Sequence, residues 1–133
     1  MTKDNTVFLS YGRRDASLAE RISAELVRAG VMPIDVHKTV SAGDFRSAIR
    51  GAIDRSQALV LVVGSPDAAS SGWLSYEMGM FDAVGKRVFL LASNTFAQSD
   101  LPADFRHVRV WGFDPGKPES AARSVASEIL AAA

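Results

Sequence analysis

The sequence predicts an α/β protein in which a parallel sheet of five strands carries helices on both faces. Short apolar runs alternate five times with segments whose apolar residues recur every three or four positions. Such alternation is typical of strand–helix units joined by right-handed crossovers. The run from Ala58 to Val63 is wholly apolar, as expected of a strand buried on both faces. These observations favour a flavodoxin-like three-layer sandwich with the strand order 2-1-3-4-5.

Spacing and end signals predict the first two elements. Residues 6–10 form a short apolar run and are expected to be the first strand. In residues 15–29 apolar side chains recur at intervals of three and four, which indicates an amphipathic helix. Asp15 is the candidate N-cap of this helix, and Gly30 is the candidate residue that ends it.

The next elements are a second strand, a loop and a helix. Residues 31–36 are expected to be a strand, and Pro33 favours an edge position because proline donates no ladder hydrogen bond. A polar loop over 37–44 then leads to a helix over 45–55. The remaining elements are a strand at 58–63, a helix over 73–84 ended by Gly85, a strand at 87–92, a looser stretch over 93–106 with room for one helical turn, a strand at 108–111 and a helix over 118–131.

Composition limits the classes of function. The 133 residues suit a single domain over 1–133, and 47% of them are apolar. The 15 basic residues equal the 15 acidic ones, which argues against bulk binding of nucleic acid or of an anionic membrane. There is no cysteine, and no apolar run approaches the roughly 20 residues that span a bilayer. We therefore expect a cytoplasmic domain with neither a disulfide nor a thiolate metal site.

Several common catalytic motifs are absent. The sequence has no glycine-rich dinucleotide or phosphate loop and no Gly-x-Ser-x-Gly elbow. His37 and His107 lie far apart, so a histidine-based metal site or triad is weakly supported. The first strand ends in Ser10-Tyr11 rather than in the acidic pair of a phosphate-accepting receiver domain. No metal site is predicted.

Glu77 with Trp73 is the pair that best suits chemistry. Both follow the buried strand at 58–63, where ligands of open α/β sheets bind, and four residues on a helix place them on one face. An aromatic ring can pack against a base, and a carboxylate can hold ribose hydroxyls and stabilise positive charge at the anomeric carbon. The alternative is that Trp73 belongs to the core and Glu77 is a solvated helix residue near a favourable dipole.

Four segments in order resemble Toll/interleukin-1 receptor (TIR) domains. The segment from Val7 to Asp15 resembles the family's opening strand and loop, and 34–45 resembles its second strand and the long BB loop. Residues 49–63 resemble the helix and strand that follow. Ser71-Gly-Trp-Leu-Ser-Tyr-Glu77 is similar to the family's Ser-x-Trp-x-x-x-Glu box. The resemblance spans about residues 6–92 and is closer to the enzymatic branch than to the adaptors.

The resemblance implies roles for particular residues. Glu77 would be the catalytic carboxylate. The implied substrate contacts are Tyr11 and Arg13 at the end of the first strand, Lys38 and Phe45 from the BB loop, and Trp73 beside the ligand. The implied self-assembly residues are Asp35, Gly43 and Asp44. Phe45 also fits helical spacing with Ile49 and Ile53, and Tyr11 could simply close the sheet, so a core role for each stays open.

The implied activity is cleavage of NAD at the nicotinamide–ribose bond. Capture by water would give ADP-ribose, and capture by a hydroxyl or by the adenine would give a cyclic isomer. NAD is then a substrate, and neither a cofactor nor a metal is needed. The resemblance further implies activation by self-association with other TIR domains, through a contact that can generate open filaments. A role in prokaryotic immune signalling, such as defence against phage, would follow.

Two other functions remain open. The first is a non-enzymatic module that binds other TIR domains, for which Glu77 and Trp73 would be dispensable. The second is a nucleoside or nucleotide N-glycosidase of the deoxyribosyltransferase type, which also places a Glu after a strand, as in Glu77-Met-Gly79. The opening Phe8-Leu-Ser-Tyr11 and Trp73 favour the TIR resemblance.

Overall fold

The computed structural model describes residues 5–35, 45–69, 73–105 and 108–132. Its centre is a five-stranded parallel sheet with the order β2-β1-β3-β4-β5, which confirms the predicted topology. The strands are β1 (Thr6–Tyr11), β2 (Met32–Ile34), β3 (Ala58–Val63), β4 (Arg87–Ser93) and β5 (Val110–Phe113).

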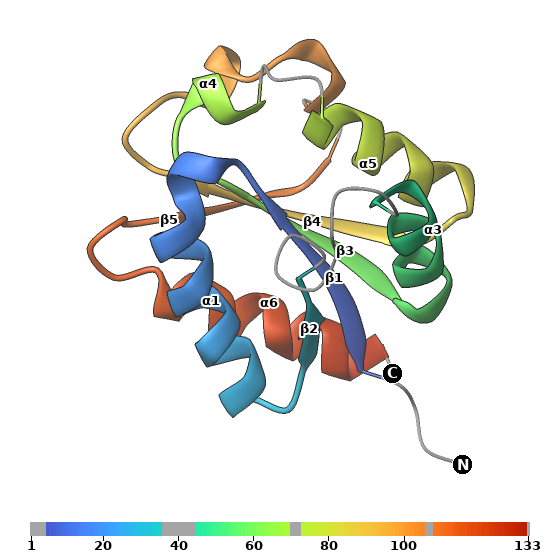
Figure 1. Ribbon diagram of the computed structural model, residues 1–133. Coiled ribbons are helices and arrows are strands. Elements are labelled where there is room, and N and C mark those ends of the chain that lie inside the picture. Colours follow the sequence, from blue (N-terminus) through green and yellow to red (C-terminus); the bar gives the residue numbers. More distant parts are fainter. Residues whose placement is uncertain (1–4, 36–44, 70–72, 106–107, 133) are drawn as a thin grey trace.

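Helices cover both faces of the sheet, as expected. They are α1 (Ala16–Arg28), α3 (Phe45–Arg55), α4 (Pro66–Ala69), α5 (Trp73–Ala83) and α6 (Glu119–Ala132), with single 3₁₀ turns at Arg13–Asp15, Gln98–Asp100 and Ala103–Phe105. In Figure 1, α1 and α6 lie side by side on one face, and α3 and α5 lie on the other.

Alternate residues of the strands build two separate cores. Val7, Leu9 and Tyr11 of β1 belong to the core beneath α1 and α6, whereas Phe8 belongs to the core beneath α3 and α5. Every residue of β3 is buried, as its apolar sequence predicts. Because successive side chains of a strand point to opposite faces, the position of a residue in β1 decides which helix layer it meets.

The glycines predicted to end α1 and α5 do so, but the predicted N-cap of α1 does not cap it with its side chain. Gly30 (φ 102°) and Gly85 (φ 74°) adopt the positive φ that favours glycine after a helix. Asp15 occupies the N-cap position of α1, yet its side chain makes no capping hydrogen bond. The carboxylate instead accepts a hydrogen bond from the backbone N–H of Gly64, at 2.9 Å.

Both edges of the sheet are short strands. Pro33 lies on the edge strand β2, as predicted, and pairs with Val7. The strand expected at 108–111 is wrong by two residues, since β5 runs from Val110 to Phe113. Phe113 explains the shift: it is buried, and it lies opposite Ser93 at the end of β4.

Candidate functional site

Glu77 lies on the inner face of α5. The neighbouring positions Leu74, Met78 and Phe81 are buried at helical spacing, and Glu77 falls within the same stripe. Its exposed fraction is 0%, the same as that of Phe81. The alternative in which Glu77 is a solvated surface residue is therefore wrong. A carboxylate in an apolar layer is unfavourable unless polar groups surround it, which makes its partners the main question.

Ser10 is a hydrogen-bond partner of Glu77. It lies near the carboxyl end of β1, opposite Leu61 of β3, and its side chain points to the α3 and α5 face. The Ser10 hydroxyl donates a hydrogen bond to Glu77 Oε1. Neither residue has exposed surface. The contact joins the helix that follows β3 to the strand beside β3, at the sheet edge where ligands of this architecture bind.

Tyr11 lies on the opposite face from Glu77. Its phenol donates a hydrogen bond to Asp35 Oδ2 at 2.5 Å, and Asp35 directly follows β2. Burial raises the pKa of the Tyr11 phenol, and the hydrogen bond and charge of Asp35 raise it further. Tyr11 and Glu77 are thus not brought together by β1. A substrate contact by Tyr11 stays a prediction, while its packing in the α1 and α6 core is observed.

The turn after β1 carries Arg13 and Asp15. Arg13 is exposed, beyond the carboxyl end of β1, where a ligand could meet it. Asp15 is buried and accepts the Gly64 N–H, which joins this turn to the end of β3. A Cβ on Gly64 would lie 2.9 Å from Asp15 Cγ, closer than real Cβ contacts come. Glycine at position 64 lets the two loops meet.

The other predicted site residues are only partly placed. Lys38, Gly43 and Asp44 lie outside the described residues. Phe45 and Trp73 begin α3 and α5, and their side chains lie outside the described part of the structure. Their proposed contacts stay predictions.

Sequence reasoning missed Ser10 and the link between Asp15 and Gly64. A signal for Ser10 was present, because a serine within a buried strand needs a hydrogen-bond partner. Its partner could not be named without the face to which Ser10 points. Gly64, directly after the apolar run of β3, carried a similar signal, since a glycine there allows a close approach.

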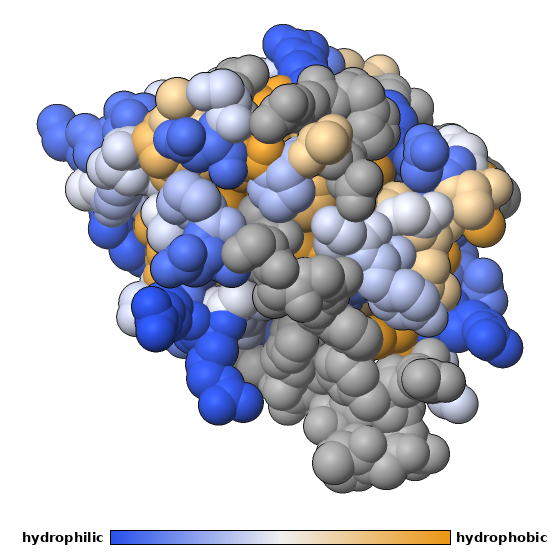
Figure 2. All heavy atoms as spheres, turned by 90° about the horizontal axis from the view of Figure 1, so that it is seen from above, coloured by the Kyte–Doolittle hydropathy of each residue, from blue (hydrophilic) through white to orange (hydrophobic). Residues whose placement is uncertain are grey.

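Figure 2 shows the side on which the carboxyl ends of the strands lie, with hydrophilic residues around the rim and apolar ones between them.

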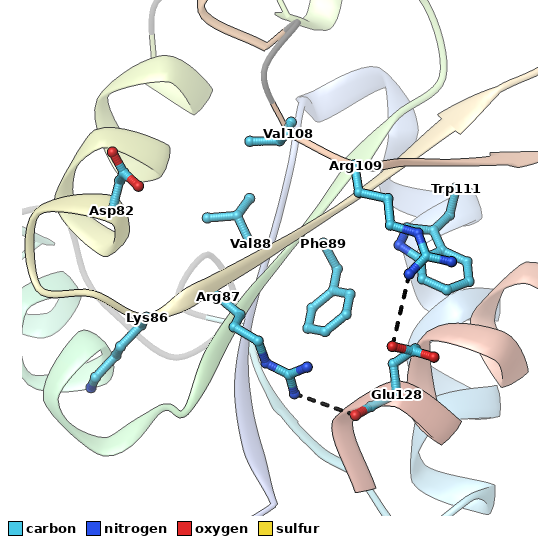
Figure 3. Close-up of a pocket in the computed structure, with 9 residues that line it drawn as sticks. All are labelled: Asp82, Lys86, Arg87, Val88, Phe89, Val108, Arg109, Trp111 and Glu128. Atoms are coloured by element: carbon cyan, nitrogen blue, oxygen red, sulfur yellow. Dashed lines mark hydrogen bonds and ion pairs between the residues drawn. The ribbon is translucent and has the colours of Figure 1, made fainter. Parts of the chain in front are cut away.

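Figure 3 shows a different feature, a cavity of about 360 Å³ beside the first residues of β4. There Arg87 and Arg109 point toward Glu128, and each guanidinium lies over an aromatic ring, Phe89 or Trp111. Neither Ser10 nor Glu77 lines it, so this cavity is separate from the site around Glu77.

Within the described ranges, no three His, Asp or Glu side chains come together in a way that could hold a metal ion. None of the helices described combines the length and the apolar composition needed to cross a membrane.

A buried carboxylate at the carboxyl edge of a sheet with the order 2-1-3-4-5 is consistent with the resemblance to TIR domains. Comparison with known families establishes the membership. The profile of the TIR domain matches residues 7–125. The chain belongs to the TIR domain family. The sequence is not significantly similar to any curated protein.

Solved TIR domains share the fold of this chain at low identity. A metazoan TIR-STING receptor from C. gigas, in complex with 2′,3′-cGAMP, is 18% identical with a TM-score of 0.70, covering 95% of this chain. The TIR domain of the Toll-related receptor TRR-2 from Hydra magnipapillata is 16% identical with a TM-score of 0.66, covering 96% of this chain and 99% of that one. The chain spans only 41% of the C. gigas receptor.

Two further solved structures share this fold. The heterodimer of the RPS4 and RRS1 TIR domains is 14% identical with a TM-score of 0.68, covering 97% of each chain. BcmB, a CMP N-glycosidase from Clostridium botulinum, is 16% identical with a TM-score of 0.60, covering 92% of this chain and 98% of that one. At these identities the likeness establishes the fold alone.

Proposed function

We propose that this TIR domain cleaves the nicotinamide–ribose bond of NAD, with Glu77 as the catalytic carboxylate. The observation that carries the proposal is the enclosed Glu77 carboxylate on the inner face of α5, held by Ser10 at the carboxyl edge of the sheet. Burying an ionisable group in an apolar layer is unfavourable for stability, and proteins commonly bear that cost at functional sites.

Cleavage of this bond requires from the protein mainly a fixed negative charge beside the ribose. The C1′–N bond breaks with its electron pair leaving on nicotinamide, which departs neutral because the ring nitrogen of NAD is cationic. Positive charge then develops on the ribose ring, as in glycoside hydrolysis. Glu77 holds the ribose hydroxyls and stabilises that charge. Water adds to C1′ and releases a proton, giving ADP-ribose; an internal nucleophile gives a cyclic isomer.

NAD is the substrate in this scheme, and no metal or cofactor takes part. The exposed Arg13 offers a cation beyond β1 for a phosphate group of NAD. Lys38, Phe45 and Trp73 remain proposed contacts of the same substrate. We place the reaction in the cytoplasm, in an immune signalling pathway of a prokaryote.

Activation by self-association is the second part of the proposal. Glu77 has no exposed surface, so its carboxylate must become accessible before it can contact ribose. Assembly with further TIR domains, through residues such as Asp35, Gly43 and Asp44, would supply the energy for that change. The heterodimer of the RPS4 and RRS1 TIR domains supports pairing within this family. Specific activity that rises with protein concentration would support assembly; a constant specific activity would exclude it.

The deciding experiment is nicotinamide release from NAD at high protein concentration with a crowding agent. Wild type is compared with Glu77→Gln and with Asp82→Asn, a matched control on the exposed side of α5. We expect release by wild type and by Asp82→Asn, and a loss of about 100-fold or more in Glu77→Gln. Equal release by all three would overturn the role of Glu77. Absence of release from folded wild type would favour a non-enzymatic TIR–TIR module.

A pyrimidine N-glycosidase is the second candidate. The likeness to a CMP N-glycosidase over 92% of this chain favours it, since the bond cleaved is of the same chemical kind. The same carboxylate would stabilise the same type of cation. Parallel assays with CMP and with nucleosides separate the two: cleavage of these substrates but not of NAD would assign the glycosidase.

A further inference from the structure

We propose that Ser10 is the positioning residue of the site: its hydroxyl holds one oxygen of the Glu77 carboxylate so that the group meets the ribose in a single orientation. The proposal rests on the proposed function of Glu77 and extends it to a residue on another element. Ser10 acts through Glu77 and does not itself contact the substrate.

The hydroxyl is suited to this role because its own position is rigid. Ser10 lies within the β1–β3 ladder, opposite Leu61, so hydrogen bonding to the adjacent strand fixes its backbone. A serine side chain has one torsion that moves its oxygen, and that torsion has three staggered positions. The exposed fraction of Ser10 is 0%, so the surrounding packing limits the torsion further.

Glu77 needs such an anchor more than Ser10 does. A glutamate side chain has three torsions, and Glu77 is 0% exposed in the same buried stripe of α5 as Leu74 and Phe81. An apolar layer of this kind does not orient a carboxylate about its last torsion, which is broad. The hydrogen bond from Ser10 to Oε1 does, and a bond to a charged acceptor is stronger than a neutral one.

The hydroxyl also stabilises the charge on which the chemistry depends. A buried carboxylate is unfavourable without donors, and a donor to its charged form offsets part of that cost. Removing the hydroxyl leaves Glu77 with one donor fewer in an apolar layer. The loss falls on the transition state, where positive charge develops, more than on ground-state binding, so kcat should drop while KM changes little.

The test compares Ser10→Ala, Ser10→Thr and a matched control, Ser56→Ala, by steady-state nicotinamide release. Ser56 is equally suitable as a buried serine: it is 2% exposed, and its hydroxyl donates to the Ala52 carbonyl at 2.6 Å on α3. We expect Ser10→Ala to lower kcat by about 10- to 100-fold with KM within about twofold. Ser10→Thr, which keeps a hydroxyl, should recover most of kcat. Ser56→Ala should keep wild-type kinetics.

A double-mutant cycle gives a second readout that does not need activity. Ser10→Ala, Glu77→Met and the double variant are unfolded with urea, and the coupling is read from the unfolding equilibrium constants. A hydrogen bond to a charged group predicts a coupling of about tenfold or more. Glu77→Met keeps the side-chain volume close to that of glutamate, which favours a folded variant.

The outcomes separate the two proposals. Wild-type release with undiminished kcat in Ser10→Ala overturns the positioning role and leaves the proposed function standing. No release from wild type overturns the proposed function, and the cycle then decides whether Ser10 holds Glu77. A coupling below about twofold overturns that claim. A kcat loss in Ser56→Ala equal to that in Ser10→Ala would also overturn it, because the effect would then come from general loosening of the core.

Discussion

Ser10 and Tyr11 are adjacent on β1, and their hydroxyls serve opposite faces of the sheet: one donates to Glu77 on α5 and the other to Asp35 after β2. A single strand therefore contacts both the candidate catalytic carboxylate on α5 and Asp35, the residue that follows β2. Side chains with such different roles can be neighbours because a strand alternates its side chains with a period of two.

Gly64→Ala should destabilise the fold through Asp15. The new Cβ would lie 2.9 Å from Asp15 Cγ, so the carboxylate must move and lose its hydrogen bond from the Gly64 N–H. We expect a loss of about 1–3 kcal/mol in the free energy of unfolding, measured with urea. Adding Asp15→Ala to this variant should cost less than Asp15→Ala costs alone, because Gly64→Ala has already broken the hydrogen bond and removing the carboxylate relieves the clash.

Gly79→Ala is the matched control for that prediction. Gly79 lies in α5, is exposed, and an added Cβ would meet nothing within 4 Å. Alanine in a helix is favoured over glycine by about 0.5–1 kcal/mol, so this variant should be more stable than wild type. A Gly64→Ala protein as stable as Gly79→Ala would contradict the proposed contact with Asp15.

Tyr11→Phe should change the stability at neutral pH but not in strong alkali. Folding raises the pKa of the Tyr11 phenol, so the protonated form favours the folded state. This contribution is fully present below the unfolded phenol pKa of about 10 and is lost as the pH rises through the higher folded value. We expect Tyr11→Phe to be about 1–2 kcal/mol less stable than wild type at pH 7.

The difference in the free energy of unfolding between wild type and Tyr11→Phe should then narrow as the pH rises above about 10. Urea unfolding at a series of pH values measures it. Tyr76→Phe is the control, because Tyr76 is 51% exposed on α5 and should show no such narrowing. A gap that stays constant into strong alkali would mean that folding does not raise the pKa of the Tyr11 phenol.

Substitutions of the two arginines that pair with the Glu25 carboxylate should have non-additive effects on the free energy of unfolding. Glu25 is buried on α1 and pairs with Arg28 Nη1 at 2.6 Å and with Arg123 Nη1 of α6 at 3.2 Å. Either arginine alone still screens the carboxylate, so Arg28→Ala and Arg123→Ala should each cost only about 0.5–1 kcal/mol. The double variant leaves a buried charge without these cations and should exceed their sum by about 1 kcal/mol or more.

The control for this prediction is Arg21→Ala, at the exposed pair with Glu119. Its effect should simply add to that of Arg28→Ala, because Arg21 and Arg28 pair with different carboxylates, and salt should weaken it more than it weakens the buried pairs of Glu25. Unfolding of the single and double variants in urea supplies all the values. Additivity of Arg28→Ala and Arg123→Ala would show that the Glu25 carboxylate reaches water when its partners are removed.

Glu77→Gln should separate stability from function. The variant keeps an oxygen that accepts from Ser10 and removes a charge from an apolar layer, so thermal unfolding should occur at the wild-type temperature or above it. Nicotinamide release should fall at the same time. A strongly destabilised Glu77→Gln protein would instead indicate that the carboxylate is a structural group.

The fold could be predicted from the sequence because its signals are local. Apolar runs indicate buried strands, and Pro33 indicates an edge, so order and layers follow from general rules of α/β topology. The last strand was misplaced because alternation in 108–111 resembles a strand, while the pairing is decided by Phe113 and Ser93, a contact between distant segments. A pairing register of this kind depends on two segments, so neither segment predicts it alone.

The site was predictable only in part for a related reason. Glu77 could be placed because it follows a buried strand on the next helix. Ser10 could not be matched to it, because β1 is buried on both faces and its alternation gives no sign of which face meets α5. Asp15 fitted a capping pattern, yet the approach of Gly64 offered its carboxylate a different donor.

Pro33 has a further consequence for how copies of this protein can meet. The Met32 N–H donates to the carbonyl of Asn5, the residue before β1, so alternation turns the next nitrogen, that of Pro33, toward the outside of the sheet. That nitrogen carries no hydrogen, so this three-residue edge offers an incoming strand no donor at its middle position. Edge-to-edge β-aggregation is thereby disfavoured at β2, and side-chain contacts rather than a shared ladder must join copies that associate there.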